Sequence, residues 1–173
     1  MIHTQNITKT DLPGVMALWT ALHEQTVENN CWPPVPDDRW FAHLCRHCSW
    51  AVAKDDGKIV GFAFWKLGPK GNAFVRAIGA MEEIPYLHLV LACVRASKEY
   101  AYGLLHRNRP EHAWYSKIGA TFEPEGYPPL TPRQEAAYAT REEKLAARVP
   151  VSEKVIVPVS LLTLVQARLE ELS

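Results

Sequence analysis

The strongest structural signal in the sequence is a tight turn between two runs of β-forming residues. Asp55-Asp56-Gly57 is the kind of turn that joins antiparallel strands, and it separates Ser49–Lys54 from Lys58–Leu67. A second turn, at residues 68–72, leads into Ala73–Met81, which we expect to form a third antiparallel strand. The chain is therefore predicted to fold around a mostly antiparallel central sheet.

Helices are predicted on either side of this hairpin along the chain. Leu12–Glu28 has apolar residues at helical spacing behind Asp11, a favourable N-cap, and a second helix begins after Asp37. Residues 86–97 are apolar almost all round, so periodicity permits a buried helix or a strand. The other expected elements are strands at Ile2–Thr8, Tyr100–Leu105, Thr121–Gly126 and Val155–Val159, a short helix at Glu111–Ile118, an inserted helix at 131–150 and an amphipathic C-terminal helix at 160–173. We expect one α/β (α+β) domain over residues 1–173.

The charge balance excludes some classes of partner. The 173 residues carry 19 Lys+Arg against 19 Asp+Glu, so the formal net charge is zero. Binding to nucleic acid or to an anionic membrane surface needs an excess of basic residues, so neither is expected. A neutral chain lacks the repulsion that keeps copies apart, which favours self-association or a complex with another protein. With no targeting segment or bilayer span in the sequence, we expect a cytoplasmic protein.

Three segments together resemble the GNAT (general N-acetyltransferase) superfamily. They are the hairpin 50–63, the helix start Asp11-Leu12-Pro13 and the segment 108–122. The last segment is the most specific of the three. In it, Asn108 is followed after seven residues by Tyr115 and after four more by Gly119, as in the family.

The resemblance implies an acyl-CoA-dependent N-acyltransferase, which moves the acetyl group of acetyl-CoA to a small-molecule or protein amine. Tyr115 is then the catalytic residue, because its phenol protonates the departing thiolate, and Asn108 hydrogen-bonds the pantetheine arm. The base for the amine is left open among His106, His112 and Glu99. The alternative is that Asn108 only makes a turn and Tyr115 only packs against the sheet.

The family's cofactor loop is matched in a degenerate form. In the family an Arg or Gln, two further residues and Gly-x-Gly/Ala stand at a helix start, where free N–H groups bind the pyrophosphate. Arg76, Gly79 and Ala80 are the matching cofactor-binding candidates. Met81 stands where a small residue is needed, and Glu82-Glu83 bring negative charge to the phosphate position. The other interpretation is a plain strand that runs into the helix without a phosphate loop.

Other reactive or aromatic residues point less clearly to a site. Cys45-Arg46-His47-Cys48 resembles half of a zinc site, but no second ligand pair follows in the sequence, so we expect no metal there. Arg107 and Arg109 either meet the phosphates of CoA or lie in a solvated turn. Trp32, in a proline-rich loop, is expected at a ligand wall or a protein contact.

Two functions therefore stay open. The first is the acetyl-CoA-dependent N-acyltransferase. The second is a catalytically inactive GNAT-fold protein that has a structural or interaction role in a larger assembly, for example a virion. The spacing of Asn108 and Tyr115 favours the enzyme, whereas the degenerate loop favours the second function, and the fold alone is compatible with both.

Overall fold

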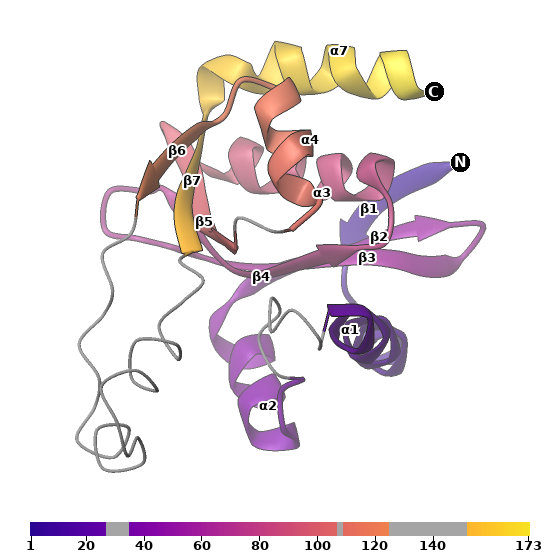
Figure 1. Ribbon diagram of the computed structural model, residues 1–173. Coiled ribbons are helices and arrows are strands. Elements are labelled where there is room, and N and C mark those ends of the chain that lie inside the picture. Colours follow the sequence, from indigo (N-terminus) through magenta and orange to yellow (C-terminus); the bar gives the residue numbers. More distant parts are fainter. Residues whose placement is uncertain (27–34, 107–108, 125–151) are drawn as a thin grey trace, which may run out of the picture.

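The computed structural model describes residues 1–26, 35–106, 109–124 and 152–173 (Figure 1). In these ranges the chain forms a seven-stranded sheet of order β1-β2-β3-β4-β5-β7-β6, with helices on both faces. All neighbouring strands are antiparallel except β4 and β5, which are parallel. The strands are β1 (Ile2–Asn6), β2 (Ser49–Asp55), β3 (Lys58–Leu67), β4 (Ala73–Ala80), β5 (Tyr100–His106), β6 (Thr121–Pro124) and β7 (Ser152–Pro158). The helices are α1 (Leu12–Thr26), α2 (Asp38–His47), α3 (Glu83–Ala96), α4 (Glu111–Lys117) and α7 (Leu162–Leu172).

The predicted hairpin is confirmed as β2 and β3. Its register pairs Asp55 with Lys58, so two residues form the turn. Both have positive φ, 46° at Asp56 and 79° at Gly57, which matches the right-handed twist of the two strands. The expected third strand is confirmed as β4, which pairs with β3 along its whole length.

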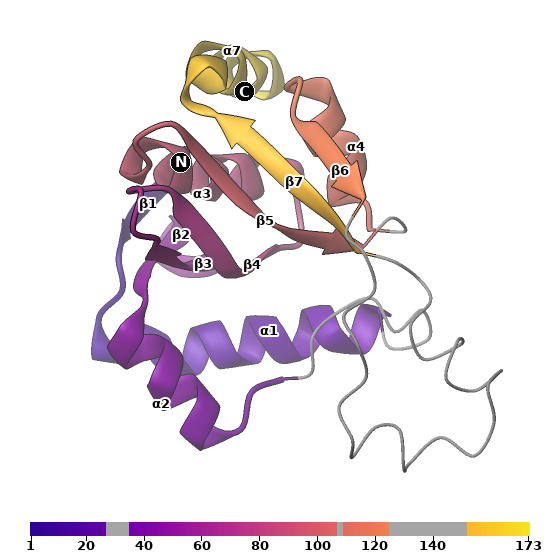
Figure 2. The ribbon, with the colours of Figure 1, turned by 90° about the vertical axis from the view of Figure 1, so that its left-hand side faces the viewer.

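The sheet is the middle layer of three. Helices α1 and α2 cover one face, and α3, α4 and α7 lie on the other (Figure 2). Alternate residues of β2 and β3 serve the two layers, because successive side chains of a strand point to opposite faces. Val52, Phe62 and Phe64 pack with Trp19 of α1, whereas Ala51, Ala53, Ala63 and Trp65 belong to the core under α3.

The apolar run that begins at residue 86 is helical, which is one of the two predicted possibilities, and the helix ends at Ala96. Helix α3 packs on β2, β3 and β4 and also against α7. Because protein surrounds it on several sides, apolar residues occur around most of its circumference, and eight of its fourteen residues are buried. This burial explains why its sequence lacks the one-sided apolar stripe of a surface helix.

The C-terminal helix is confirmed as α7, which buries Val165 and Leu169. The helix predicted at 131–150 and the aromatic residue Trp32 lie outside the described residues, so both stay predictions. In the described part of the chain, no helix has the length and apolar character needed to cross a membrane.

Candidate functional site

The sheet opens between its two parallel strands. β4 and β5 pair only at Ala73–Ala101 and Phe74–Tyr102, and beyond these pairs the strands separate. A cavity of about 110 Å³ lies in the opening. Its walls are Val75–Ile78 of β4, Ala101–Leu105 of β5, Tyr86, Val90 and Cys93 of α3, Tyr115 and Glu111 of α4, and Arg109, Val155 and Val157.

Two tyrosines meet on the helical side of this cavity. The Tyr115 hydroxyl lies 3.1 Å from that of Tyr86, and the two rings are T-shaped at 5.6 Å. Both side chains are buried. Burial is the main cause that raises the pKa of both phenols, so both are protonated at neutral pH. Tyr115, predicted from its spacing to Asn108, is thus a neutral proton donor at the cavity.

A buried ion pair forms another part of the cavity wall. Arg109 donates from Nε to Glu111 Oε2 at 2.9 Å and from Nη2 to Glu111 Oε1. Arg109 is 6% exposed and Glu111 1% exposed, so neither lies in a solvated turn. Each charge compensates the other in an apolar setting where an unpaired charge would be costly. From the sequence, Glu111 was predicted only as the first residue of a short helix, although an acid two residues after an arginine is a local signal for such a pair.

Two of the three base candidates, His112 and Glu99, have described side chains, whereas the side chain of His106 lies outside what the structure describes. His112 Nε2 lies 3.1 Å from Glu153 Oε2, and the ring of His112 stacks on Phe122 at 4.1 Å. Neither His112 nor Glu99 is among the described residues that line the cavity. Asn108 lies outside the described residues, so its contact with a pantetheine arm stays a prediction.

The candidate phosphate residues Arg76, Gly79 and Ala80 all lie within β4. Gly79 pairs with Phe62, and Ala80 pairs with Gly61. Only two residues separate Ala80 from the start of α3, so this segment has the form of the plain strand that runs into a helix. Arg76 lies at the cavity wall, and its guanidinium carbon is 5.4 Å from the centre of the Phe74 ring.

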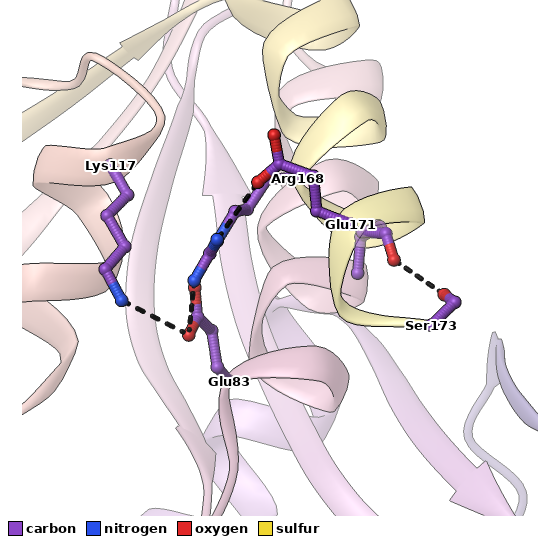
Figure 3. A network of polar contacts seen from close by, with 6 residues as sticks. Glu83, Lys117, Arg168, Glu171 and Ser173 are labelled. Atoms are coloured by element: carbon purple, nitrogen blue, oxygen red, sulfur yellow. Dashed lines mark hydrogen bonds and ion pairs between the residues drawn. The ribbon is translucent and has the colours of Figure 1, made fainter.

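Glu83, the first residue of α3, lies in a charged cluster together with Lys117 and Arg168, here called the Glu83 cluster (Figure 3). Arg168 of α7 donates to both Glu83 carboxylate oxygens, at 2.9 Å from Nε and 3.3 Å from Nη2. Lys117 Nζ of α4 is 3.8 Å from Glu83 Oε2. The same Arg168 donates from Nη1 to Glu171 at 3.0 Å. This cluster joins three helices, α3, α4 and α7, at the start of α3.

The cysteine segment forms no metal centre in the described ranges. Cys45 and Cys48 are half-buried free thiols, and burial is the main cause that raises the pKa of each. No group of three or more His, Cys, Asp or Glu side chains in these ranges is arranged to hold a metal ion.

No protein-family model and no curated protein sequence matches this chain. Solved structures do match. An acetyltransferase of the GNAT family from Bacillus cereus has a TM-score of 0.60 and 11% identity, over 91% of this chain and 97% of its own. The ribosomal-protein-S18-alanine N-acetyltransferase from Escherichia coli has a TM-score of 0.54 and 14% identity, over 92% and 94%.

N-acetylglutamate synthase from Neisseria gonorrhoeae, solved with coenzyme A and N-acetyl-glutamate, matches with a TM-score of 0.59 and 12% identity. The match covers 92% of this chain and only 35% of the synthase. These identities are too low to carry an activity over, but the arrangement of strands and helices is shared along nearly the whole chain. The chain therefore has the fold of the GNAT acetyltransferases.

Proposed function

We propose that the protein is an N-acyltransferase, which takes its acyl group from a pantetheine thioester and passes it to an amine. The observation that carries the proposal is the opening between β4 and β5, with Tyr115 on its wall. A parallel pair that is bonded at only two positions leaves backbone groups and a cavity available to an extended arm. A closed sheet would have left no such room.

The residues of the site fit the thioester end of acetyl-CoA but not its nucleotide end. The cavity is mostly apolar and has a neutral phenol, which suits the thioester and its arm. At the other end the start of α3 holds Glu83 and its cations, and Gly79 and Ala80 are engaged in strand pairing. Arg76 lies at the cavity wall and stays a proposed donor-binding residue beside the arm, and Asn108 stays a proposed hydrogen-bond partner of the arm itself. The proposed chemistry therefore depends on the thioester and not on the nucleotide.

In the proposed step the amine nitrogen attacks the thioester carbonyl carbon. The C–N bond forms and the C–S bond breaks, with its electron pair left on sulfur. The Tyr115 hydroxyl gives its proton to that sulfur, and the proton lost by the amine returns to the Tyr115 oxygen through solvent. The products are an amide and a free thiol, so no oxidant or reductant is needed. The raised pKa of Tyr115 keeps the donor proton in place until the thiolate forms.

The test follows thiol release from acetyl-CoA and from S-acetylpantetheine with a panel of amino acids, polyamines and peptides that have free N-termini. Tyr115→Phe should lower turnover by about 100-fold or more, because general acid catalysis contributes on the order of that factor. Donor affinity, measured by calorimetry, should stay within about threefold. Tyr100→Phe is the matched control, since Tyr100 is on β5 but is not one of the residues that line the cavity.

The second candidate function is a GNAT-fold protein without catalysis that binds itself or another protein. The Glu83 cluster favours it, because a carboxylate stands at the helix start where the family binds phosphate. Failure of both thioesters to bind at millimolar concentration would exclude the acyltransferase and leave this function. A chain that sediments as a monomer at high concentration would argue against self-association.

A further inference from the structure

We infer that the acyl donor is recognised through its pantetheine thioester arm alone, and that the Glu83 cluster keeps a nucleotide pyrophosphate away from α3. This inference rests on the proposed function and specifies its donor class. The donors are acyl-pantetheine thioesters from which the protein requires nothing beyond the arm. A GNAT-fold enzyme that needed the nucleotide would have to bind its phosphates at the start of α3.

Two acidic residues stand at the start of α3. A helix N-terminus attracts negative charge because its first backbone N–H groups have no partner within the helix. Here Glu83 is the first helical residue, and Glu82 is the N-cap. Neither side chain is shown capping the helix, but both carry negative charge close to its start and would repel a phosphate there.

The cations near this helix start are already engaged. Arg168 binds the Glu83 carboxylate with two donors and Glu171 with a third. The side chains of Glu83 and Arg168 are only 15% and 21% exposed, so solvent screens their pair weakly. Lys117 faces the same carboxylate. A pyrophosphate would have to displace Glu83 from two cations before it could use either of them.

The cavity itself begins beyond this cluster. The α3 residues on its wall are Tyr86, Val90 and Cys93, and Tyr86 is three residues after Glu83. Arg109 and Glu111, which also line the cavity, neutralise each other. The cavity thus offers apolar walls and a phenol to a thioester arm. The charged side chains of the Glu83 cluster, by contrast, are paired with one another.

The experiment compares acetyl-CoA with S-acetylpantetheine on the full wild-type chain, with dissociation constants from calorimetry. We expect the two constants to agree within about threefold, because the nucleotide adds no contact. Acetyl-CoA binding tenfold or more tightly would overturn this inference and keep the proposed function. Absence of binding by either donor would overturn the proposed function, and this inference with it.

Two glutamine variants then test the cluster directly. Glu83→Gln removes one of the two charges at the helix start and leaves Arg168 paired with Glu171 alone, so it should tighten acetyl-CoA about two- to fivefold and leave S-acetylpantetheine unchanged. Glu171→Gln is the matched control, because Glu171 binds the same Arg168 but lies on α7, and it should change neither constant. An unchanged or weaker acetyl-CoA constant in a folded Glu83→Gln would overturn the role assigned to Glu83. If that variant does not fold, the wild-type comparison alone decides.

Discussion

At the scale of single residues, Asp11 fixes the entry to α1. It ends the 3₁₀ turn Lys9–Asp11, and its carboxylate is 2.6 Å from Lys54 Nζ on β2. The backbone N–H and the hydroxyl of Thr8 also donate to this carboxylate, at 2.8 and 2.9 Å. These contacts lower the pKa of Asp11, with Lys54 as the largest cause and the backbone of Thr8 next. One buried acid thus joins the first helix to the hairpin.

The contribution of Asp11 to stability should depend on pH in a defined direction. Its pKa in the folded chain lies below its unfolded value, so the ionised carboxylate stabilises the fold above about pH 4. That stabilisation is lost as the pH falls through the lowered pKa. Asp11→Asn should therefore lower the free energy of unfolding by about 1 kcal/mol at pH 7. The difference from wild type should shrink towards zero near pH 2.

Urea denaturation at a series of pH values measures this difference. Glu24→Gln is the control, since Glu24 is an exposed acid on α1, and we expect its effect to stay within about 0.5 kcal/mol. A difference between Asp11→Asn and wild type that is the same at pH 7 and pH 2 would show that the charge of Asp11 is not what stabilises the entry.

At the scale of elements, the close contact between α3 and β3 depends on Gly61. A Cβ at this position would lie 2.7 Å from Leu89 Cδ1 and 3.3 Å from both Ala80 Cβ and the Gly79 carbonyl oxygen. Leu89 is fully buried, so it has no space into which to withdraw. Gly61→Ala should therefore destabilise the protein by about 1–3 kcal/mol through overpacking.

Thermal and urea unfolding measure the effect of Gly61→Ala against Gly68→Ala. A Cβ on Gly68 would meet nothing closer than 3.7 Å, so the control should stay near wild type. Equal stability of the two variants would mean that α3 can move off the sheet without cost. In that case the α3 side of the cavity wall would not be held rigidly against the sheet.

Much of this layout follows from local sequence, because hairpin turns, caps and apolar stripes are encoded over a few residues. The Asp55-Asp56-Gly57 turn predicted both strands of the hairpin, and the spacing from Asn108 placed Tyr115 in the region of the site. The partners across the fold were not predictable in this way. Glu83 was expected to bring negative charge to the phosphate position, but its partner Arg168 lies 85 residues further along the chain. No local pattern links two such positions.

The form of the cavity was likewise beyond local reasoning. Its existence depends on where β4 and β5 stop pairing, which the apolar content of either strand does not encode. Tyr86 was assigned to an apolar run, yet its hydroxyl bonds Tyr115. Arg109 was expected at phosphates or in solvent, and its burial becomes evident only once α4 brings Glu111 beside it.

At the scale of the whole molecule, the sheet consists of two parts that meet at a narrow junction. Strands β1 to β4 form one part, and β5, β7 and β6 form the other. Besides two residue pairs, the junction is held by Asn72, which is 4% exposed. Its Oδ1 accepts from the backbone N–H groups of Glu99 and Tyr100, at 3.0 and 3.2 Å. The Asn72 side chain thus holds β4 and β5 together at the end where the two strands still pair.

Asn72→Ala should therefore affect stability and binding together. Two backbone donors lose their acceptor, which should cost about 2 kcal/mol in the free energy of unfolding. Amide hydrogen exchange should quicken at the β4–β5 junction, and affinity for S-acetylpantetheine should fall because the cavity walls are no longer fixed relative to each other. Asn6→Ala, on the exposed edge strand β1, is the matched control and should be nearly silent. If Asn72→Ala proved as silent as Asn6→Ala in unfolding and exchange, the helices on the two faces would be what holds the parts of the sheet together. The opening would then be a consequence of helix packing and not of the strand junction.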